Sequence, residues 1–441
     1  MKTYIEQAVE NKLQAIKEKE NIFQIGRVRK ITRYMLEVSG LEKVGFFEKV
    51  YIGDKGEGYI EKIGTNMVIV AVTRIYAPIQ VGDEVIASGE EFMTYFSPES
   101  MGCIVDMFGM DQLTGKKFND LIALPIESEA IPIMDRSAVC RPLHTGLTGI
   151  DMLYPIGRGQ RQLIIGDKKT GKTQIGLDAI VNQRTEEMIC IYIAIGKTKK
   201  EVKEVYAQLR DKDAMAYTLI VAAFNDECAP VMRNTVYAGV AYAEHYLREG
   251  KDVLVIIDDL KRHADVYREV SLLSGKVPGR DAYPPDIFYA HASVLEKGCQ
   301  HKNGGSITIL PICETKGGDI TDYISTNIIS ITDGQIVLSS KKFEQGHKPA
   351  IDYGLSVSRL GGAVQTREIK ETGAPIRNEL LSYLEQKEIF ELANMDEMGE
   401  ELKEKMRRGH IIEEKLKQYK FNPKTTKEMI DDFKVLNGGD E

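Results

Sequence analysis

The sequence lacks the two features that carry a protein into or across a membrane. No apolar run in its 441 residues reaches the roughly eighteen residues that a membrane-spanning helix needs. The first residues include Lys2 and Glu6, which put charge where a signal peptide would have an apolar core. We therefore expect a cytoplasmic protein, and any link to a membrane would run through partner subunits.

Cysteine patterns that would build a disulfide framework or a zinc site are also missing. The chain has six cysteines, and none of them stands in a C-x-x-C pair or another metal-ligand spacing. We expect reduced thiols within the core, no disulfide and no zinc. The net charge of −8 argues against a nucleic-acid-binding protein, although a local basic channel is compatible with an acidic total.

A phosphate-binding motif is the strongest signal in the sequence. Residues 166–173 match Gly-x-x-x-x-Gly-Lys-Thr, with an apolar run before them at 163–165 and a helical pattern after them at 174–181. In that context the loop N–H groups would cradle phosphates at the positive end of the helix. Lys172 would reach the terminal phosphates, and Thr173 would offer its hydroxyl to Mg²⁺. The motif predicts a nucleotide site.

The two ends of the chain are predicted to differ from its middle. Residues 1–21 predict an amphipathic helix that would pack on its own chain or dock on a partner; its apolar face holds Ile5, Val9, Leu13 and Ile16. Residues 22–97 carry short β-branched or alternating runs broken by glycine, and they predict a small antiparallel β-barrel. Residues 374–441 are helical and charged in pattern, and they predict a small α-helical domain.

The middle of the chain, residues 98–373, predicts an α/β nucleotide-binding domain. Buried strands alternate there with helical stretches, which argues for a doubly wound, mostly parallel sheet. The expected strands after the phosphate-binding loop are the apolar runs at 188–196, 219–223, 253–259 and 307–312.

Asp258 is the candidate metal-side carboxylate. It ends an apolar run, where a phosphate-binding ATPase keeps the carboxylate that orders Mg²⁺ and its waters, whereas Asp259 suits a cap on the next helix. Hydrolysis would also need a group that polarises the attacking water, commonly a Glu, and an arginine that stabilises charge on the transferred phosphoryl group.

Four more stretches carry a resemblance that no single motif could. They are Pro-Ile-Gly-Arg-Gly-Gln-Arg at 155–161, Pro-Gly-Arg-Asp-Ala-Tyr-Pro at 278–284, Thr-Asn-Ile-Ile-Ser-Ile-Thr-Asp-Gly-Gln at 326–335, and Pro-Ala-Ile-Asp-Tyr-Gly-Leu-Ser-Val-Ser-Arg at 349–359. Together they resemble the alpha subunit of the F-type rotary ATP synthase, the nucleotide-binding but non-catalytic partner of the beta subunit. The resemblance is close over about 141–370 and looser outside that range.

The resemblance implies a site that holds ATP or ADP with Mg²⁺ and does not turn it over. Beta subunits carry a catalytic Glu after the glycine that ends the second strand, and alpha subunits usually carry Gln, whereas this chain has Lys197. An ammonium group cannot accept a proton from water and would pair with phosphate instead. Thr173 and Asp258 would serve the metal. The expected nucleotide contacts are Gly166, Asp167, Lys168, Lys169, Thr170, Gly171, Lys172, Thr173, Gln174, Lys197 and Gln418.

Arg359 is the residue for which the resemblance implies a catalytic role in trans. The arginine of the Ser-Val-Ser-Arg segment projects into the beta site as an arginine finger, and such a cation can be worth about 10³ to 10⁵ in rate. A surface salt bridge is the alternative. The segment 416–423 resembles the one that closes over adenine in alpha subunits, so Gln418 would contact the base or be an ordinary polar residue of a solvated helix.

The resemblance also implies an assembly. Three such chains would alternate with beta-like catalytic subunits around a gamma-like central shaft, and the N-terminal helix would hold a delta-like peripheral stalk subunit. The whole would be a proton-transporting ATP synthase, peripheral on the cytoplasmic face of the cell membrane, and this chain alone would have little or no activity.

Four departures suggest a divergent subunit. They are Lys197, the pair Lys168 and Lys169 where Arg-Gln is common, a shortened C-terminal domain, and Gly-Met-Asp-Gln-Leu-Thr-Gly at 109–115 where the family has a Gly-x-Pro-Ile-Asp-Gly turn. A specialised F-like ATPase that does not move protons is therefore an alternative. A second is a homohexameric motor of the flagellar, type III secretion or Rho type, but those motors keep the catalytic Glu that Lys197 replaces. A third is a nucleotide-binding structural protein outside any rotary machine.

Overall fold

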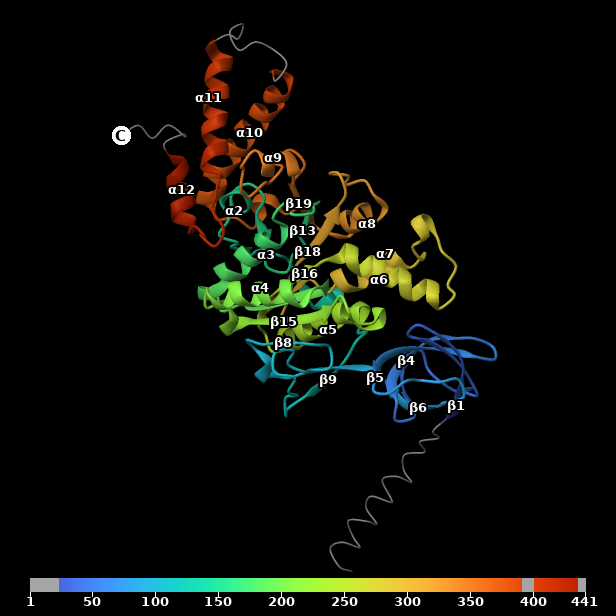
Figure 1. The fold of residues 1–441 in the computed structure, drawn as a ribbon. Coiled ribbons are helices and arrows are strands. Elements are labelled where there is room, and N and C mark those ends of the chain that lie inside the picture. Colours follow the sequence, from blue (N-terminus) through green and yellow to red (C-terminus); the bar gives the residue numbers. More distant parts are fainter. Residues whose placement is uncertain (1–23, 391–399, 435–441) are drawn as a thin grey trace, which may run out of the picture.

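The computed structural model describes residues 24–390 and 400–434. A small barrel is followed by a large α/β domain and then by helices (Figure 1). The predicted helix at residues 1–21 lies outside the described residues. Within the described ranges, no helix is long and apolar enough to cross a membrane.

The N-terminal barrel is confirmed. Its strands are antiparallel and close in the order β1-β2-β5-β4-β3-β6. Valines and isoleucines on alternate positions fill the interior, including Val68, Val70 and Val72 of β5. Gly58 lets β4 and β5 approach, because a Cβ there would lie 2.2 Å from the carbonyl oxygen of Ala71. The strands are β1 (Ile25–Thr32), β2 (Met35–Ser39), β3 (Glu48–Ile52), β4 (Gly56–Ile63), β5 (Val68–Ile75) and β6 (Glu84–Glu91).

A buried ion pair anchors the barrel to the α/β domain. Arg233 lies on helix α5 (Ala229–Arg248) and donates to both carboxylate oxygens of Glu61 on β4, at 3.0 and 2.7 Å. The same guanidinium donates to the hydroxyl of Tyr59 at 2.8 Å. Because the pair is out of water, removing one partner would cost about 3–5 kcal/mol. The contact therefore fixes where the barrel sits.

The predicted parallel sheet is confirmed as the centre of the α/β domain. Its strands run in the order β20-β19-β13-β18-β16-β14-β15-β8, and most neighbours are parallel. The apolar runs that predict strands coincide with observed strands to within a few residues at each end. The strands are β8 (Ile104–Val105), β13 (Leu163–Asp167), β14 (Ile189–Lys197), β15 (Thr218–Phe224), β16 (Asp252–Asp258), β18 (Ser306–Thr315), β19 (Gly334–Leu338) and β20 (Val357–Ser358).

Helices cover both faces of this sheet, as a doubly wound fold requires. On β14, Ile191, Ile193 and Ile195 belong to one apolar cluster, whereas Cys190 and Tyr192 belong to another. Side chains alternate between the faces of a strand, so the two clusters are two separate cores. The first core holds residues of α5 and α6 (Leu260–Leu273); the second holds residues of α3 (Lys172–Val181) and α4 (Lys199–Arg210).

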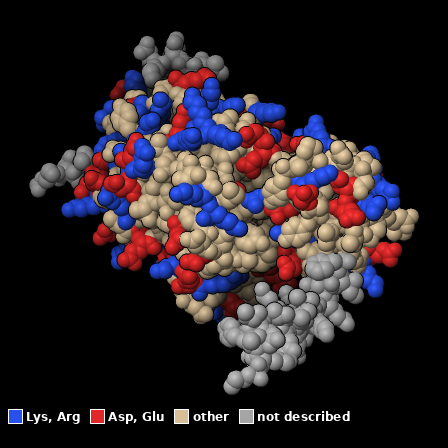
Figure 2. All heavy atoms as spheres, turned by 60° about the horizontal axis from the view of Figure 1, so that its bottom comes forward, with Lys and Arg blue, Asp and Glu red and all other residues tan. Residues whose placement is uncertain are grey.

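Further helices and short strands complete the chain. The helical part begins with α10 at Arg367, a few residues before the predicted boundary at 374. On the face shown in Figure 2, positive and negative side chains are interspersed rather than gathered by sign. The remaining helices are α2 (Thr148–Asp151), α7 (Ile287–Leu295), α8 (Tyr323–Ile331), α9 (Ser340–Glu344), α10 (Arg367–Phe390), α11 (Glu400–Lys415) and α12 (Thr426–Lys434). The remaining strands are β7 (Met93–Phe96), β9 (Ile122–Pro125), β10 (Arg136–Ser137), β11 (Pro142–Leu143), β12 (Ile156–Gly157) and β17 (Cys299–His301).

Candidate functional site

The phosphate-binding motif forms the expected strand, loop and helix. Strand β13 ends at Asp167, and α3 begins at Lys172. Lys169 and Gly171 have φ values of 66° and 98°, which turn the loop back on itself. The first N–H groups of a helix have no partner within it and carry its partial positive charge. The loop and helix therefore present a phosphate-binding end to the space beside the sheet.

A pocket of about 720 Å³ opens at this end of the sheet. The loop lies on one side of it, and the carboxyl ends of β14, β16 and β18 supply Lys197, Asp258 and Glu314. Ligands of open parallel sheets bind at the carboxyl ends of the strands. The predicted residues that line the pocket are Lys168, Lys169, Thr170, Gly171, Lys172, Thr173, Gln174, Lys197, Asp258 and Gln418.

Two predicted contact residues lie behind the pocket wall instead. A Cβ on Gly166 would lie 2.7 Å from the carbonyl oxygen of Leu338, so this glycine permits close packing of β13 on β19. The carboxylate of Asp167 accepts hydrogen bonds from the Thr315 hydroxyl at 2.6 Å and from the Gly318 N–H at 2.8 Å. Asp167 therefore fastens the loop to the turn after β18.

Asp258 is bound by three side chains at the end of β16. One carboxylate oxygen accepts from the Thr173 hydroxyl and from the Tyr192 hydroxyl, each at 2.7 Å. The other oxygen lies 2.7 Å from the ammonium nitrogen of Lys197. Sequence reasoning expected Lys197 to face phosphate, and the structure pairs it with Asp258. The neighbouring Asp259 caps α6 through the N–H of Arg262 at 2.6 Å, as predicted.

Burial and neighbouring charges set the ionisation of this group. Burial alone would lower the pKa of Lys197, but the carboxylates of Asp258 and Asp259 outweigh it and raise that pKa. Burial lowers the pKa of Lys172 despite the surrounding carboxylates. Burial and the charge on Asp258 raise the pKa of Asp259. Lys197 is therefore a fixed cation at neutral pH.

Gln418 lines the pocket, but its amide makes hydrogen bonds within the fold. Its Nε2 donates to the carbonyl oxygens of Gly146 and Asn422 at 2.6 and 2.7 Å. Its Oε1 accepts from the N–H of Thr148 at 3.1 Å. These bonds hold the segment after α11 against the pocket. Gln418 is buried, so it is not a residue of a solvated helix. Adenine contact by Gln418 stays a prediction.

Arg359 lies outside this pocket, at the edge of the sheet. It follows β20, the outermost strand beside β19, and its N–H donates to the carbonyl oxygen of Asp333 at 3.0 Å. The side chain is exposed. Among the described residues, no hydrogen bond, ion pair or ring contact engages its guanidinium group. The alternative of a surface salt bridge therefore has no partner in that part of the chain.

Among the pocket residues that sequence reasoning missed, Tyr192 and Glu314 matter most for its chemistry. Tyr192 reads as an ordinary strand residue, and only the pairing of β14 with β16 brings its hydroxyl to Asp258. Glu314 was missed because its strand, β18, is far in sequence from the phosphate-binding motif. In the sheet, Glu314 pairs directly with Gly166, the glycine that opens the motif. A parallel neighbour of the phosphate-binding strand that ends in a carboxylate is the signal that could have found it.

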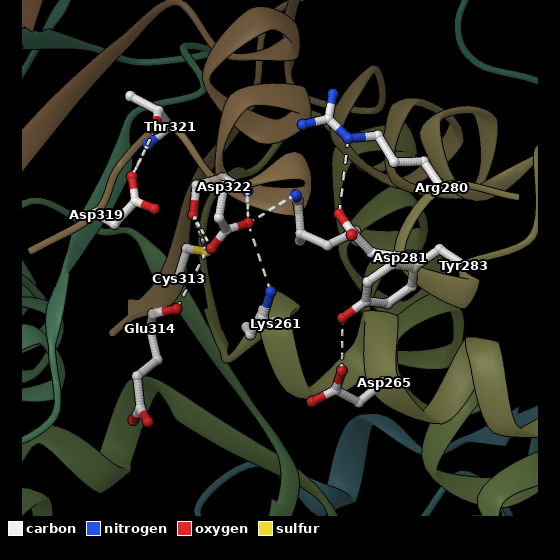
Figure 3. Close-up of polar contacts among 12 residues, drawn as sticks. Lys261, Asp265, Arg280, Asp281, Tyr283, Cys313, Glu314, Asp319, Thr321 and Asp322 are labelled. Carbon is white, nitrogen blue, oxygen red and sulfur yellow. Dashed lines mark hydrogen bonds and ion pairs between the residues drawn. The ribbon is translucent and has the colours of Figure 1, made fainter. Parts of the chain in front are cut away.

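Glu314 belongs to the pocket and not to the polar cluster beside it. In Figure 3 its carboxylate points away from the group formed by Lys261 and Asp322. Asp322 caps α8 through the N–H groups of Ile324 and Ser325 at 2.8 and 3.0 Å, and Lys261 lies 3.5 Å from it. The loop at 278–284 is held nearby through the Tyr283 hydroxyl, which donates to Asp265 at 2.7 Å (Figure 3).

The fold and the pocket together define a P-loop nucleotide-binding protein, with its parallel sheet between a closed barrel and a helical segment. Residues 146–358 match the family described as ATP synthase alpha/beta family, nucleotide-binding domain. The ATP synthase subunit alpha of Macrococcus caseolyticus (strain JCSC5402) is 40% identical over 425 residues, which cover 95% of this chain and 83% of that relative. The chain therefore belongs to the ATP synthase alpha/beta family, and its resemblance to the alpha subunit is confirmed.

Proposed function

We propose that this chain is a regulatory, non-catalytic subunit of a rotary ATP synthase or ATPase, which binds ATP or ADP and supplies Arg359 to a neighbouring catalytic site. The observation that carries the proposal is a contrast within one chain. The partly buried ammonium group of Lys197 pairs with Asp258 where catalysis needs a base, while an exposed arginine lies at the sheet edge outside the pocket.

Phosphate binding would fall to the loop and the start of α3. The N–H groups of residues 169–173 would contact phosphate oxygens, and Lys172 would add a charged hydrogen bond. Lys168 and Lys169 are exposed at the mouth and would raise the local concentration of anions. Gln418 would form the wall against which the adenine packs.

Mg²⁺ suits the oxygen donors at Asp258. Its carboxylate and the Thr173 hydroxyl are 2.7 Å apart, and Mg²⁺ usually takes one or two carboxylates with waters and substrate phosphates. Residues 24–390 and 400–434 contain no group of three acidic, His or Cys side chains that could hold a metal alone. Thr173 and Asp258 would therefore hold the ion together with phosphate, whose charge it would neutralise.

Arg359 would act in the active site of a beta-like partner. A planar guanidinium group held at the boundary would lie on the charge that develops during phosphoryl transfer. Its attachment to Asp333 through the backbone leaves the whole side chain available for that partner. The proposed assembly alternates these chains with beta-like subunits around a gamma-like shaft, with a delta-like stalk subunit, on the cytoplasmic face of the membrane.

The test is ATP turnover by the purified chain, alone and reconstituted with a beta-like partner. We expect nucleotide binding but negligible turnover alone, and turnover in the mixture. Robust turnover by the chain alone would overturn the proposal and favour a homohexameric motor. Glu314 is then the carboxylate to examine, because a Glu314→Gln variant that abolished that turnover would identify it as the base. Proton transport by the membrane complex separates an ATP synthase from an F-like ATPase that moves no protons.

A further inference from the structure

Lys197 is placed over the end of the sheet by a local irregularity of its strand. The pairing of β14 with β15 shifts register between Ile195 and Lys197, which is a bulge. Gly196 within it has a φ of 61°, and a Cβ there would lie 2.6 Å from Nε of Arg262. The bulge therefore turns the lysine toward β16, where its ammonium nitrogen lies 2.7 Å from Asp258 and 4.0 Å from Asp259.

The position matters because a polyphosphate must approach these carboxylates. Asp258 and Asp259 are both buried, and Glu314 lines the same pocket. Negative groups this close repel phosphate, and in P-loop sites a divalent cation normally offsets that repulsion. Here an ammonium group that belongs to the chain already neutralises part of the charge. Lysine has three N–H donors, so one can bond Asp258 while another reaches a phosphate oxygen.

We propose that Lys197 is a built-in cation that takes over part of the charge-neutralising role of Mg²⁺, so that this pocket holds nucleotide with only weak dependence on Mg²⁺. The inference rests on the proposed function, because it takes the pocket to be a nucleotide site. It adds a regulatory property: the subunit would stay loaded with nucleotide when free Mg²⁺ falls. Its carboxylates still suit a metal ion, which would add to the ammonium charge.

The experiment measures ATP affinity of the full chain by calorimetric titration, in excess Mg²⁺ and in EDTA. We expect the two affinities of the wild type to agree within about tenfold. In Lys197→Gln, the ratio of the affinity in Mg²⁺ to the affinity in EDTA should grow by about tenfold or more. This is the size of effect that one charge within about 4–6 Å exerts on an ionisable neighbour. Lys197→Arg keeps the charge and should keep the wild-type ratio. Lys203→Gln, which changes an exposed lysine of α4 that does not line the pocket, is the matched control and should not alter that ratio.

The outcomes separate the two proposals. A wild type that loses more than about a hundredfold in affinity in EDTA overturns the inference, whatever the variants do, and so does a Lys197→Gln ratio equal to that of the wild type. If Lys197→Gln fails to fold with Asp258 left unpaired, Lys197→Gln/Asp258→Asn removes both charges of the pair. Because the net charge of the pocket is then unchanged, the ratio of its ATP affinities in Mg²⁺ and in EDTA should stay within about tenfold, as in the wild type. Absence of ATP binding by the folded wild type under both conditions would instead refute the nucleotide site itself.

Discussion

The pocket and the sheet edge differ in whether their charged residues are paired within the chain. In the pocket, Lys197 and Asp258 satisfy each other, and Asp258 is 1% exposed. At the edge, Arg359 is exposed, and the described chain offers its guanidinium no partner. Burial makes an unpaired charge costly in free energy, so Asp258 has its counter-ion within the same chain. An exposed arginine can stay unpaired at no cost in folding free energy, so Arg359 can remain without a partner until a second subunit binds.

The largest expected effect comes from removing the arginine at the sheet edge. Arg359→Ala should lower turnover of the reconstituted complex by about 10³ to 10⁵, because a cation on the transferred phosphoryl group is lost. The same change should leave ATP affinity and the melting temperature of the isolated chain unaltered, because the guanidinium makes no hydrogen bond, ion pair or ring contact in the described chain. Steady-state kinetics, calorimetric titration and thermal melting measure the three quantities.

The matched control is Arg367→Ala, which removes another exposed arginine. Among the described residues, its one ion pair is with Glu371, one helical turn further along. This variant should leave turnover within about twofold, since such surface pairs are worth at most about 0.5 kcal/mol. Equal losses from Arg359→Ala and Arg367→Ala would assign the effect to general surface charge. An unchanged turnover in Arg359→Ala would remove the finger role.

Removing a phosphate-binding side chain from the pocket should give the next largest effect, and it should act on ATP binding by this chain. Lys172→Ala should weaken ATP binding by about 100-fold, because charged hydrogen bonds to phosphate are worth roughly 1.5–3 kcal/mol. The stabilisation by ATP, about 2.7 kcal/mol at a hundred times the dissociation constant, should then largely disappear from melting curves. Lys168→Ala, at an exposed position in the same loop, should weaken binding much less. Equal effects of the two variants would show that only the overall charge of the loop matters.

The same contrast explains what could be predicted from the sequence. The phosphate-binding loop is local, so strand, loop and helix were all visible in residues 163–181. The barrel and parallel sheet followed from strand periodicity. The partner of Lys197 was not visible, because it depends on which strands are neighbours: β14 lies beside β16, and β18 beside β13. Tyr192 and Glu314 were missed for the same reason, since register is a long-range property.

The resemblance to alpha subunits assigned roles to single residues, which periodicity could not do, but it did not show which neighbours their polar atoms contact. It placed a finger role on Arg359 and an adenine contact on Gln418, yet the amide of Gln418 is bonded to Gly146, Thr148 and Asn422. A motif transfers the identity of a residue, whereas the use of its polar atoms depends on neighbours that differ from chain to chain. Gly166 and Asp167 make the same point, because Gly166 serves close packing of strands and Asp167 accepts hydrogen bonds that hold the loop.

A pH experiment tests how strongly the pocket depends on burial. Burial raises the pKa of Asp178, on α3, to about 6, although its carboxylate accepts from the N–H of Phe421 at 2.7 Å. The unfolded carboxyl has a pKa of about 3.9, so this group favours folding below about pH 4 and loses that contribution as pH rises through 6. Asp178→Asn should remove this loss, gaining about 2 kcal/mol on the wild type between pH 4 and pH 7 in denaturant melts.

Asp226→Asn is the control for that experiment. Asp226 is exposed and pairs with Lys199, which lowers its pKa, so its variant should not gain stability on the wild type as pH rises. A pH-independent difference between Asp178→Asn and the wild type would mean that Asp178 titrates alike in the folded and unfolded chain. Because neither residue is near Arg359, turnover in the complex should not follow this pH dependence.

The smallest expected effect comes from loosening the edge without removing its charge. Asp333 binds Arg161 through two side-chain contacts, at 2.9 and 2.7 Å, and its carbonyl oxygen holds the N–H of Arg359. Asp333→Asn should weaken the Arg161 contacts and let the segment at 357–359 shift, which should lower turnover of the complex about tenfold, since small misplacements of catalytic groups are costly. ATP affinity of the chain's own pocket should stay unchanged, because neither residue lines it. A loss of ATP affinity equal to the loss of turnover would mean that a shift of the sheet edge also displaces the pocket. The edge and the pocket would then differ only in whether their charged residues are paired within the chain.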